Sequence, residues 1–364
     1  MKKTVYYESE TLLREFTYRS FIAAGLNNDD AKIASEVLLL ADSRGIDSHG
    51  IGRLKQFYLD KISSGVIQIN QPISIIKESL SAAVIDAQNG LGLVVANQAM
   101  KLAIEKAKKT GIAIIFVRNS SHYGIAGYGP LLAAREGLIG ISGTNASRIV
   151  APINSSQPIL GTNPIAVSFP SDEPFPFLLD GATSTISVGK IEYYQKIGKS
   201  LPNGWVKDAL GNDVNHPAEA LAGIKRREYT LSPLGGFSEL TAGFKGFGLG
   251  LAIELLSTVV QKGSKFCGSY PQEVQKSVGH FFIAINPELF IEGTELKKSV
   301  GETLRTIRNS QNSGESIMVS GEKEYLESLK RQEEGIPISE AVVRDLYSIR
   351  EQYKIPIRFT WEQT

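Results

Sequence analysis

The chain has 364 residues, of which 42% are hydrophobic and 21% charged, and its formal net charge is +1. This composition is typical of a globular protein with a sizeable core. The balanced charge gives no electrostatic reason to expect nucleic acid or an anionic membrane as a partner. The one cysteine, Cys267, excludes an intramolecular disulfide and a cysteine-built metal site, and it favours a reducing compartment, the cytoplasm. No apolar run is long enough to span a bilayer.

The N-terminal part of the chain predicts helices. Apolar residues recur at helical intervals in residues 9–26. Residues 29–45 open with two aspartates, which are favourable in the first turn of a second helix. A third helix is expected to start at Gly50, with Ser48 as its cap, and to end near Gly65.

The middle of the chain predicts alternating strands and helices. Six short apolar runs indicate strands, at residues 82–87, 112–117, 139–142, 164–169, 177–180 and 280–286. Helical patterns lie at residues 92–111, 129–137 and 247–260, and charged helical patterns return at 296–310 and 322–335. Residues 196–217 are turn-rich. We therefore expect an α/β domain of residues 76–295 beside a helical domain formed by residues 1–75 and 296–364.

A Rossmann fingerprint is missing from the sequence. The nearest candidates, QNGLGLVVAN (88–97) and GFKGFGLGLA (243–252), lack both the G-x-G-x-x-G spacing and its strand–turn–helix context. If this protein binds a dinucleotide, it does so without the usual fold.

His49 and Arg53 stand four residues apart in DSHGIGR (47–53). Near the start of one helix, their side chains can converge on one small anion. Arginine holds a carboxylate by two hydrogen bonds, and an imidazole with a pKa near 6.5 exchanges a proton with an adjacent carbonyl or alcohol. The pair outlines a site for a 2-hydroxy or 2-oxo acid. On spacing alone, a surface His–Arg pair at a helix start is the other interpretation.

His122 follows a strong predicted strand and precedes a helix expected near Tyr128 or Gly129. Strand-to-helix loops often carry function, because a rigid scaffold positions them. The glycines of NSSHYGIAGYG (119–129) permit a ligand to approach the backbone closely. These glycines can equally serve only the turn, so local evidence leaves both interpretations open.

Two further segments could hold an anion or a ribose. Lys245 lies between Gly243 and Gly246 at a probable helix start, where free N–H groups and the helix dipole favour an anion. LLDGATST (178–185) is a strand end rich in hydroxyl groups. For the segment around Lys245, the alternative is that its glycines only allow tight helix packing. For residues 178–185, the alternative is an ordinary strand end without a ligand.

Metal-site spacings such as H-E-x-x-H are missing, so no metal is expected. His216 is expected in a loop before a helix, and His280 is expected to have a structural role at the start of a strand.

Taken together, several long motifs in register resemble the type-2 malate/L-lactate dehydrogenase family, which includes sulfolactate and ureidoglycolate dehydrogenases and diketo-acid or ketimine reductases. The motifs are RGIDSHGIGRL (44–54), NSSHYGIAGYG (119–129), GTNPIAVSFP (161–170), LDGATSTISVGKI (179–191), LPNGWVKDALGN (201–212), GGFSELTAGFKGFGLGLAIELL (235–256), SGEKE (320–324) and GIPIS (335–339).

This resemblance implies an α/β fold with a non-Rossmann, largely antiparallel cofactor domain and a helical domain made from both chain ends. It also implies NAD or NADP as cofactor, a small-molecule 2-oxo or 2-hydroxy acid as substrate, and a homodimer with its active site near the subunit interface. Which nicotinamide is used stays open.

The resemblance further implies roles for individual residues. His49 and His122 would be the acid/base candidates, Arg53 would hold the substrate carboxylate, and Tyr58 and Ser147 would line the same pocket. The segments that contact the dinucleotide would supply Asp180, Gly181, Ala182, Thr183, Ser184, Phe244, Lys245, Gly321 and Glu322. The chain departs from the family pattern at Ser320, at His216 and at Tyr193 and Tyr194, which puts the identity of the substrate in doubt more than the reaction type.

These observations predict an oxidoreductase that transfers a hydride between a nicotinamide and C2 of a malate-, lactate- or sulfolactate-like acid. One imidazole donates the proton and the other orients it or the substrate, and the nearby Arg53 favours His49 as donor. The alternatives are a cyclic ketimine reductase and a non-catalytic small-molecule binder on the same fold.

Overall fold

The computed structural model describes residues 5–262 and 278–362. A seven-stranded sheet crosses its centre in the spatial order β2-β3-β4-β10-β5-β6-β7. Only β3 and β4 run parallel; every other neighbouring pair is antiparallel. The strands are β2 (Ser74–Glu78), β3 (Ala82–Asp86), β4 (Ile112–Ser120), β5 (Ile139–Thr144), β6 (Ile165–Phe169), β7 (Phe177–Gly181) and β10 (Val278–Ile285). The expected, largely antiparallel sheet is confirmed, and it differs from the parallel sheet of the Rossmann fold.

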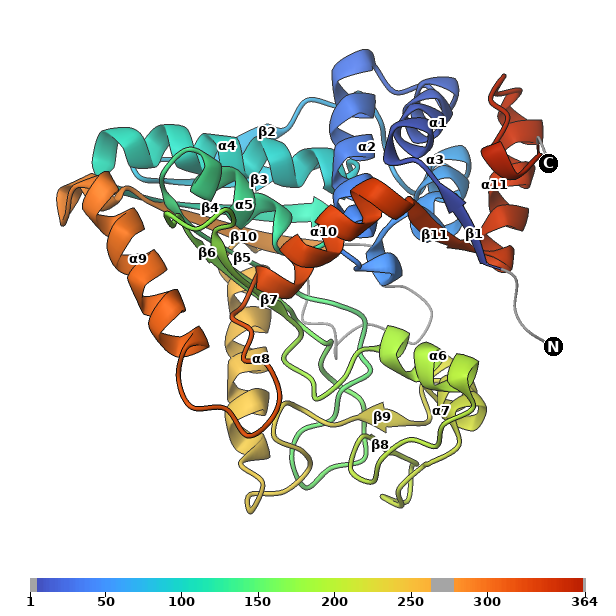
Figure 1. Ribbon diagram of the computed structural model, residues 1–364. Coiled ribbons are helices and arrows are strands. Elements are labelled where there is room, and N and C mark those ends of the chain that lie inside the picture. The colour runs from blue at the N-terminus through green and yellow to red at the C-terminus, as the bar shows by residue number, and fades with distance from the viewer. Residues whose placement is uncertain (1–4, 263–277, 363–364) are drawn as a thin grey trace.

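Helices cover both faces of this sheet. α4 (Gly92–Thr110) and α5 (Tyr128–Arg135) lie above it in Figure 1, and α8 (Gly243–Thr258) lies below it. α4 packs closely because alanines line its buried side against the branched side chains of β3 and β4. Such branched residues favour strands, and each that is fully buried stabilises the fold by roughly 1.5–3 kcal/mol.

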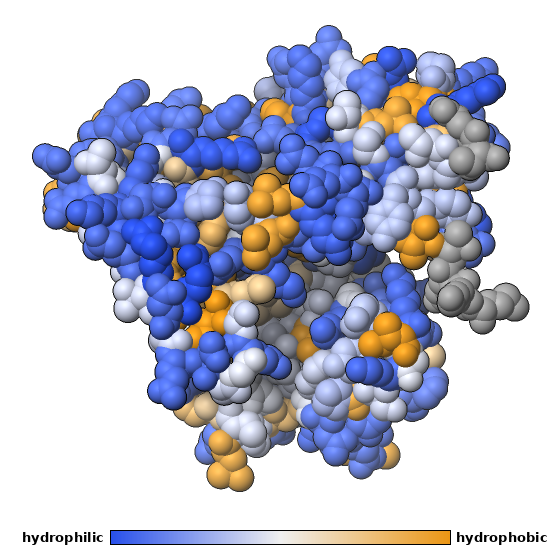
Figure 2. Space-filling model, in the orientation of Figure 1, coloured by the Kyte–Doolittle hydropathy of each residue, from blue (hydrophilic) through white to orange (hydrophobic). Residues whose placement is uncertain are grey.

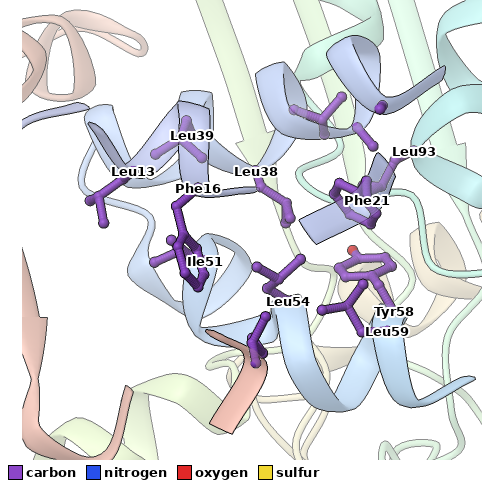
Figure 3. Close-up of a cluster of buried hydrophobic side chains, with 14 of the residues drawn as sticks. Leu13, Phe16, Phe21, Leu38, Leu39, Ile51, Leu54, Tyr58, Leu59 and Leu93 are labelled. Atoms are coloured by element: carbon purple, nitrogen blue, oxygen red, sulfur yellow. The ribbon is translucent and has the colours of Figure 1, made fainter. Parts of the chain in front are cut away.

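The two chain ends meet in a helical region beside the sheet. β1 (Val5–Glu8) pairs antiparallel with β11 (Ile336–Ser339). The helices here are α1 (Glu10–Ala23), α2 (Asn28–Ser43) and α11 (Glu340–Tyr353). Their shared core includes Phe16, Phe21 and Phe359, and Figure 3 shows part of it. Segments that are far apart in the sequence therefore depend on one another for burial.

α9 (Gly293–Arg308) and α10 (Glu322–Glu334) connect the sheet to this helical region. Leu304 of α9 packs in a small separate cluster with Phe175, which precedes β7, and with Val319. Tyr325 of α10 stacks on Phe175 with 5.3 Å between ring centres. The domain boundaries expected from the sequence stay a prediction.

A satellite subdomain lies on the far side of the sheet from α4 (Figure 1). It comprises α6 (Val188–Ile197), β8 (Val206–Lys207), α7 (Pro217–Lys225) and β9 (Thr230–Leu231), and it has its own apolar cluster. The turn-rich residues 196–217 join α6 to α7, and His216 precedes α7 in a loop, both as predicted. In Figure 2 the drawn face is mostly hydrophilic and is hollowed at its centre, between the part that carries α10 and the part that carries α6 and α7.

The prediction of a third helix, from Gly50 to near Gly65, is wrong. Residues 47–63 instead form two 3₁₀ turns, η1 (Asp47–His49) and η2 (Ile51–Arg53), a π-helix, η3 (Leu54–Leu59), and the short α3 (Asp60–Ser63). Ser48 caps no helix, because its hydroxyl bonds the ring of its neighbour, His49. Short 3₁₀ segments also lie at η5 (Pro287–Leu289) and η6 (Thr360–Glu362).

Some elements of the structure were not predicted from the sequence, and one residue discussed there lies outside the described structure. β1, β2, β11 and α11 were not expected, and Cys267 lies outside the described residues. In the part of the chain that the structure describes, no helix has the length and apolar character to cross a bilayer. Over the same residues, no group of three or more potential ligands is placed to hold a metal ion.

Candidate active site

The backbone around His49 is held by a buried carboxylate. Oδ2 of Asp42, at the end of α2, accepts a hydrogen bond from the N–H of Ile51 at 2.6 Å. Gly50 packs so closely against this carboxylate that a Cβ there would overlap it. The glycine that follows His49 is therefore required for packing.

Arg331 of α10 ties the same segment to the C-terminal part of the chain. Its Nη1 donates to the carbonyl oxygen of Asp42 at 2.7 Å, and its guanidinium also pairs with Asp47. Glu327, one turn earlier on α10, accepts a hydrogen bond from Nε of Arg331 at 2.7 Å. Because these partners come from distant segments, tertiary contacts decide the irregular backbone of residues 47–53.

The π-helix η3 turns two consecutive aromatic side chains toward His122. The hydroxyl of Tyr58 lies 2.7 Å from Nδ1 of His122. The ring of Phe57 meets the same imidazole edge-on, with 5.4 Å between ring centres. Tyr58 is fully buried, and Figure 3 shows its ring beside Phe21, Leu54 and Leu59. Single π-turns often mark functional sites, and this one lets neighbouring residues face one target.

The loop between β4 and α5 presents His122, and α5 begins at Tyr128 as predicted. Ser121 anchors the loop, because its hydroxyl accepts from the N–H of Gly92 at 2.8 Å and donates to the carbonyl oxygen of Gly90 at 3.0 Å. A Cβ on Gly92 would overlap the carbonyl oxygens of Ser121 and His122. Gly124 has a φ of 82°, which favours glycine.

The structure brings the two imidazoles together. The rings of His49 and His122 stack with 5.6 Å between centres and 21° between planes. Burial, and then the charge of Arg53, lower the pKa of His49 from 6.5 to about 4. Burial lowers the pKa of His122 well below 6.5, and the nearby charges of His49 and Lys61 act in the same direction. Both rings are therefore neutral at pH 7.

Hydrogen bonds assign the tautomer of His122. Nδ1 lies 3.3 Å from the backbone N–H of Gly124, a group that can only donate. Burial raises the pKa of Tyr58, so its hydroxyl keeps its hydrogen and donates to the same nitrogen. Nδ1 is thus the acceptor, and the ring hydrogen of neutral His122 sits on Nε2.

Arg53 lies beside His49. Its Nε donates to the carbonyl oxygen of Ser48 at 2.6 Å, and its guanidinium carbon lies 4.8 Å from the centre of the Phe57 ring. Over the described residues, the structure gives Arg53 no ion pair. Its two terminal nitrogens are therefore available to a carboxylate.

The remaining substrate candidate, Ser147, is exposed and follows β5. Its place in the pocket stays a prediction.

Two of the departures from the family pattern lie on α6. Tyr194 packs against Trp205 of the satellite cluster, with 5.1 Å between ring centres, whereas Tyr193 is half exposed.

The cofactor candidates of residues 180–184 lie at the end of β7 and just beyond it. Asp180 accepts a hydrogen bond from the N–H of Gly127 at 2.7 Å, and burial raises its pKa to about 6. Gly181 faces open space, and Ala182 is half-buried. The hydroxyls of Thr183 and Ser184 donate to backbone carbonyls, so these two residues shape the loop.

The other cofactor candidates lie at helix starts. Phe244 and Lys245 are exposed in the first turn of α8, next to Ala242, which has a φ of 61°. Gly321 has a φ of 95° and packs against the backbone at the start of β7. Glu322 accepts from the N–H of Val319 and pairs with Arg308 at 2.9 Å, so both of its oxygens are engaged within the chain.

These surroundings fit a nicotinamide dinucleotide. Nε of Arg44 is buried without a partner in the described residues, and its charge acts on Asp180. The backbone at Gly181 is open, and Lys245 is exposed at a helix start, so these residues offer further donors for phosphate and ribose oxygens. Arg44 and Asp180, Lys245 and the open backbone at Gly181 are the residues that would hold the cofactor.

Sequence reasoning missed four residues of this site, namely Arg44, Ser48 as a ring partner, Phe57 and Lys61. Arg53, Phe57 and Lys61 recur at intervals of four residues, a signal that could have placed all three on one helical face.

Residues 9–347 match the family model described as malate/L-lactate dehydrogenase. The chain belongs to this family. It is 45% identical over 93% of its length to the malate dehydrogenase of Pyrococcus abyssi, of which 92% is covered. It is 40% identical over 89% of its length to the L-sulfolactate dehydrogenase of Methanocaldococcus jannaschii, of which 91% is covered. The crystal structure of malate dehydrogenase from Entamoeba histolytica matches with a TM-score of 0.94 and 39% identity, covering 98% of this chain and 100% of that one.

Membership of the malate/L-lactate dehydrogenase family confirms the resemblance seen in the sequence motifs. Relatives that are 40–45% identical over most of the chain are named dehydrogenases, so this protein is an oxidoreductase.

Proposed function

We propose that this oxidoreductase transfers a hydride between NAD or NADP and C2 of a small 2-hydroxy or 2-oxo acid of the malate, lactate or sulfolactate type. The observation that carries the proposal is a free guanidinium, Arg53, beside two neutral and stacked imidazoles. The relatives named malate and sulfolactate dehydrogenase support this substrate class.

Arg53 binds the substrate carboxylate. Its Nε is held by the carbonyl oxygen of Ser48, which leaves two terminal nitrogens to form a bidentate pair. A carboxylate fixed this way aligns the adjacent C2 for reaction. The bound nicotinamide supplies or accepts the hydride at C2.

His49 exchanges the proton. Its Nδ1 is bonded to the hydroxyl of Ser48 at 2.9 Å, a group that can donate or accept, so Nε2 can hold a lone pair or a proton. When a 2-hydroxy acid is oxidised, neutral His49 accepts the hydroxyl proton. When a 2-oxo acid is reduced, protonated His49 donates to the carbonyl oxygen.

His122 acts as a fixed hydrogen-bond donor. Tyr58 and Gly124 occupy Nδ1, so Nε2–H is the group that His122 can offer to a substrate oxygen. A donor aimed at this oxygen stabilises the negative charge that develops there during reduction. The two histidines therefore have different roles in spite of their similar settings in the sequence.

Substrate binding adjusts the pKa of His49. In the free protein the charge of Arg53 helps to lower this pKa to about 4. A substrate carboxylate neutralises that charge, so the pKa of His49 rises when the acid binds. Proton uptake for the reduction is thereby coupled to the presence of substrate.

The proposal extends to assembly and compartment. α8 exposes the apolar side chains of Phe244, Leu249 and Leu255, and Val259 is exposed just after its end. A second copy of the chain covers these side chains in the proposed homodimer, because large exposed apolar patches mark interaction sites. The single cysteine supports the cytoplasm as the compartment.

The test is loss of reduced-nicotinamide absorbance with NADH and NADPH in separate assays. Pyruvate, oxaloacetate, sulfopyruvate and a cyclic imino acid are offered in turn. Turnover of at least one 2-oxo acid, and loss of that turnover in Arg53→Met, is the expected result. Turnover of the imino acid alone would replace the proposal by a ketimine reductase.

A further inference from the structure

Lys61 is a second cation beside the two histidines. It follows Arg53 and Phe57 at four-residue intervals through η2, η3 and α3. Its Nζ lies 5.2 Å from the centre of the Phe57 ring, and the Arg53 guanidinium carbon lies 4.8 Å from the same centre. The two charges therefore lie within about 10 Å of each other, one Debye length at 0.1 M salt.

The charge of Lys61 has no partner within the described chain. Lys55, six residues earlier, pairs with Asp60 at 3.0 Å, whereas the structure gives Lys61 neither an ion pair nor a side-chain hydrogen bond among the described residues. Lys61 is also half-buried, and burial lowers its pKa. A half-buried, unpaired ammonium is costly unless a ligand supplies the opposite charge.

The charges of Lys61 and Arg53 both lower the pKa of His122. The charge of Arg53 lowers the pKa of His49, whereas Lys61 has a larger effect on the pKa of His122 than Arg53 has. Both cations therefore lie close enough to the histidines to act on them. The Phe57 ring contacts both cations and packs edge-on against His122.

We propose that Lys61 binds a second anionic group of the substrate, so that the protein selects 2-oxo and 2-hydroxy acids with two negative charges. This inference rests on the proposed function, in which Arg53 takes the C1 carboxylate and the histidines address the C2 oxygen. A carboxylate or a sulfonate at the other end of a short chain then meets Lys61. A methyl group at that end of the substrate leaves the positive charge of Lys61 without a partner.

The experiment compares substrates that share a carbon skeleton. Oxaloacetate is paired with 2-oxobutanoate, and sulfopyruvate with pyruvate, in the wild type, in Lys61→Met and in Lys61→Arg. Lys55→Met is the matched control, because Lys55 lies on the same segment and already has a carboxylate partner. Calorimetric binding of L-malate and of 2-hydroxybutanoate provides a readout that needs no turnover.

Lys61→Met is expected to lower kcat/KM for both dianions by roughly 10- to 100-fold, mainly through KM, the size of one lost charge-assisted hydrogen bond. In the same variant, kcat/KM for 2-oxobutanoate and for pyruvate is expected to change by less than about 3-fold, as for the loss of an exposed charge. Lys61→Arg is expected to restore most of the kcat/KM that Lys61→Met loses with the dianions. A larger loss for one dianion identifies which group, carboxylate or sulfonate, the site takes.

Equal losses for mono- and dianions would overturn the proposal, and so would a weakened cofactor affinity with unchanged selectivity. Failure of the wild type with every 2-oxo acid would contradict the proposed function instead. In that case, L-malate binding that Lys61→Met leaves unchanged would also overturn the role of Lys61.

Discussion

The hydroxyl of Tyr58 donates to Nδ1 of His122 across 2.7 Å, and this contact determines which ring nitrogen of His122 carries the hydrogen. Two residues 64 positions apart in the chain are joined by it. The tyrosine ring belongs to the core formed by both chain ends, whereas the histidine follows a central strand. The contact therefore links the packing of the helical region to the chemistry proposed for the site.

Replacing Tyr58 with phenylalanine should raise the pKa of His122. The hydroxyl bonds the neutral form of the ring, and removal of such a bond makes protonation at Nδ1 easier. NMR titration of the ring hydrogens can follow this change, because the chain has only four histidines. Tyr7→Phe, at an exposed tyrosine, is the control. An unchanged pKa would mean that Tyr58 does not set the state of His122.

Replacing each histidine separately should distinguish their roles. His49→Gln is expected to lower kcat by about 10²- to 10⁴-fold, the usual contribution of a general acid or base. His122→Gln keeps an N–H donor and should lose less than about 10²-fold, whereas His122→Ala loses more. His216→Gln, at the start of α7, serves as control. If His122→Gln were the more damaging change, with cofactor binding intact, the two roles would have to be exchanged.

Gly50→Ala should damage both stability and activity. A Cβ at this position overlaps the buried carboxylate of Asp42, so the segment that carries His49 must move. Strain of this kind costs roughly 1–3 kcal/mol of unfolding free energy. Urea unfolding and kcat measure the two effects. Gly248→Ala, at an open helical position, is the control and should leave stability the same or higher.

Acid should destabilise the protein through its buried histidines. The pKa of His49 falls from 6.5 to about 4 on folding, and the pKa of His280 falls to about 3. Below pH 6.5 the unfolded chain therefore binds protons at these histidines that the folded chain does not bind. The resulting stability is complete above pH 6.5 and is lost as the pH falls toward 4. Urea midpoints at pH 7.5, 6 and 5 measure the loss. The pKa of His122 is lowered as well, so replacing both His49 and His122 by glutamine should weaken the dependence and leave the part that His280 contributes.

Local patterns in the sequence predicted the main elements of the sheet. The runs that became β4 and β10 are rich in isoleucine, valine and phenylalanine, residue types that fit a pleated and partly buried strand. β2 could not be recognised in the same way, because all five of its residues are exposed. The pairing of β1 with β11 joins the two ends of the chain, and no local pattern reports such a contact.

The site was predictable in its residue types more than in its geometry. Motifs in register identified His49, Arg53 and His122, and the structure stacks His49 on His122 with the charge of Arg53 close enough to act on both rings. The backbone that positions them was not predictable, because the carboxylate of Asp42 and the guanidinium of Arg331 decide it from other segments. Lys61 was missed because its isolation from acidic partners is visible only in three dimensions.

The most direct test of hydride transfer follows a deuterium label. The protein is supplied with reduced nicotinamide that carries deuterium at the transferred C4 position, together with the 2-oxo acid that it turns over. The product is then examined by NMR. The account predicts deuterium at C2 of the 2-hydroxy acid, and none at C2 when unlabelled cofactor is used in D₂O. A C2 hydrogen that comes from the solvent would contradict the central claim.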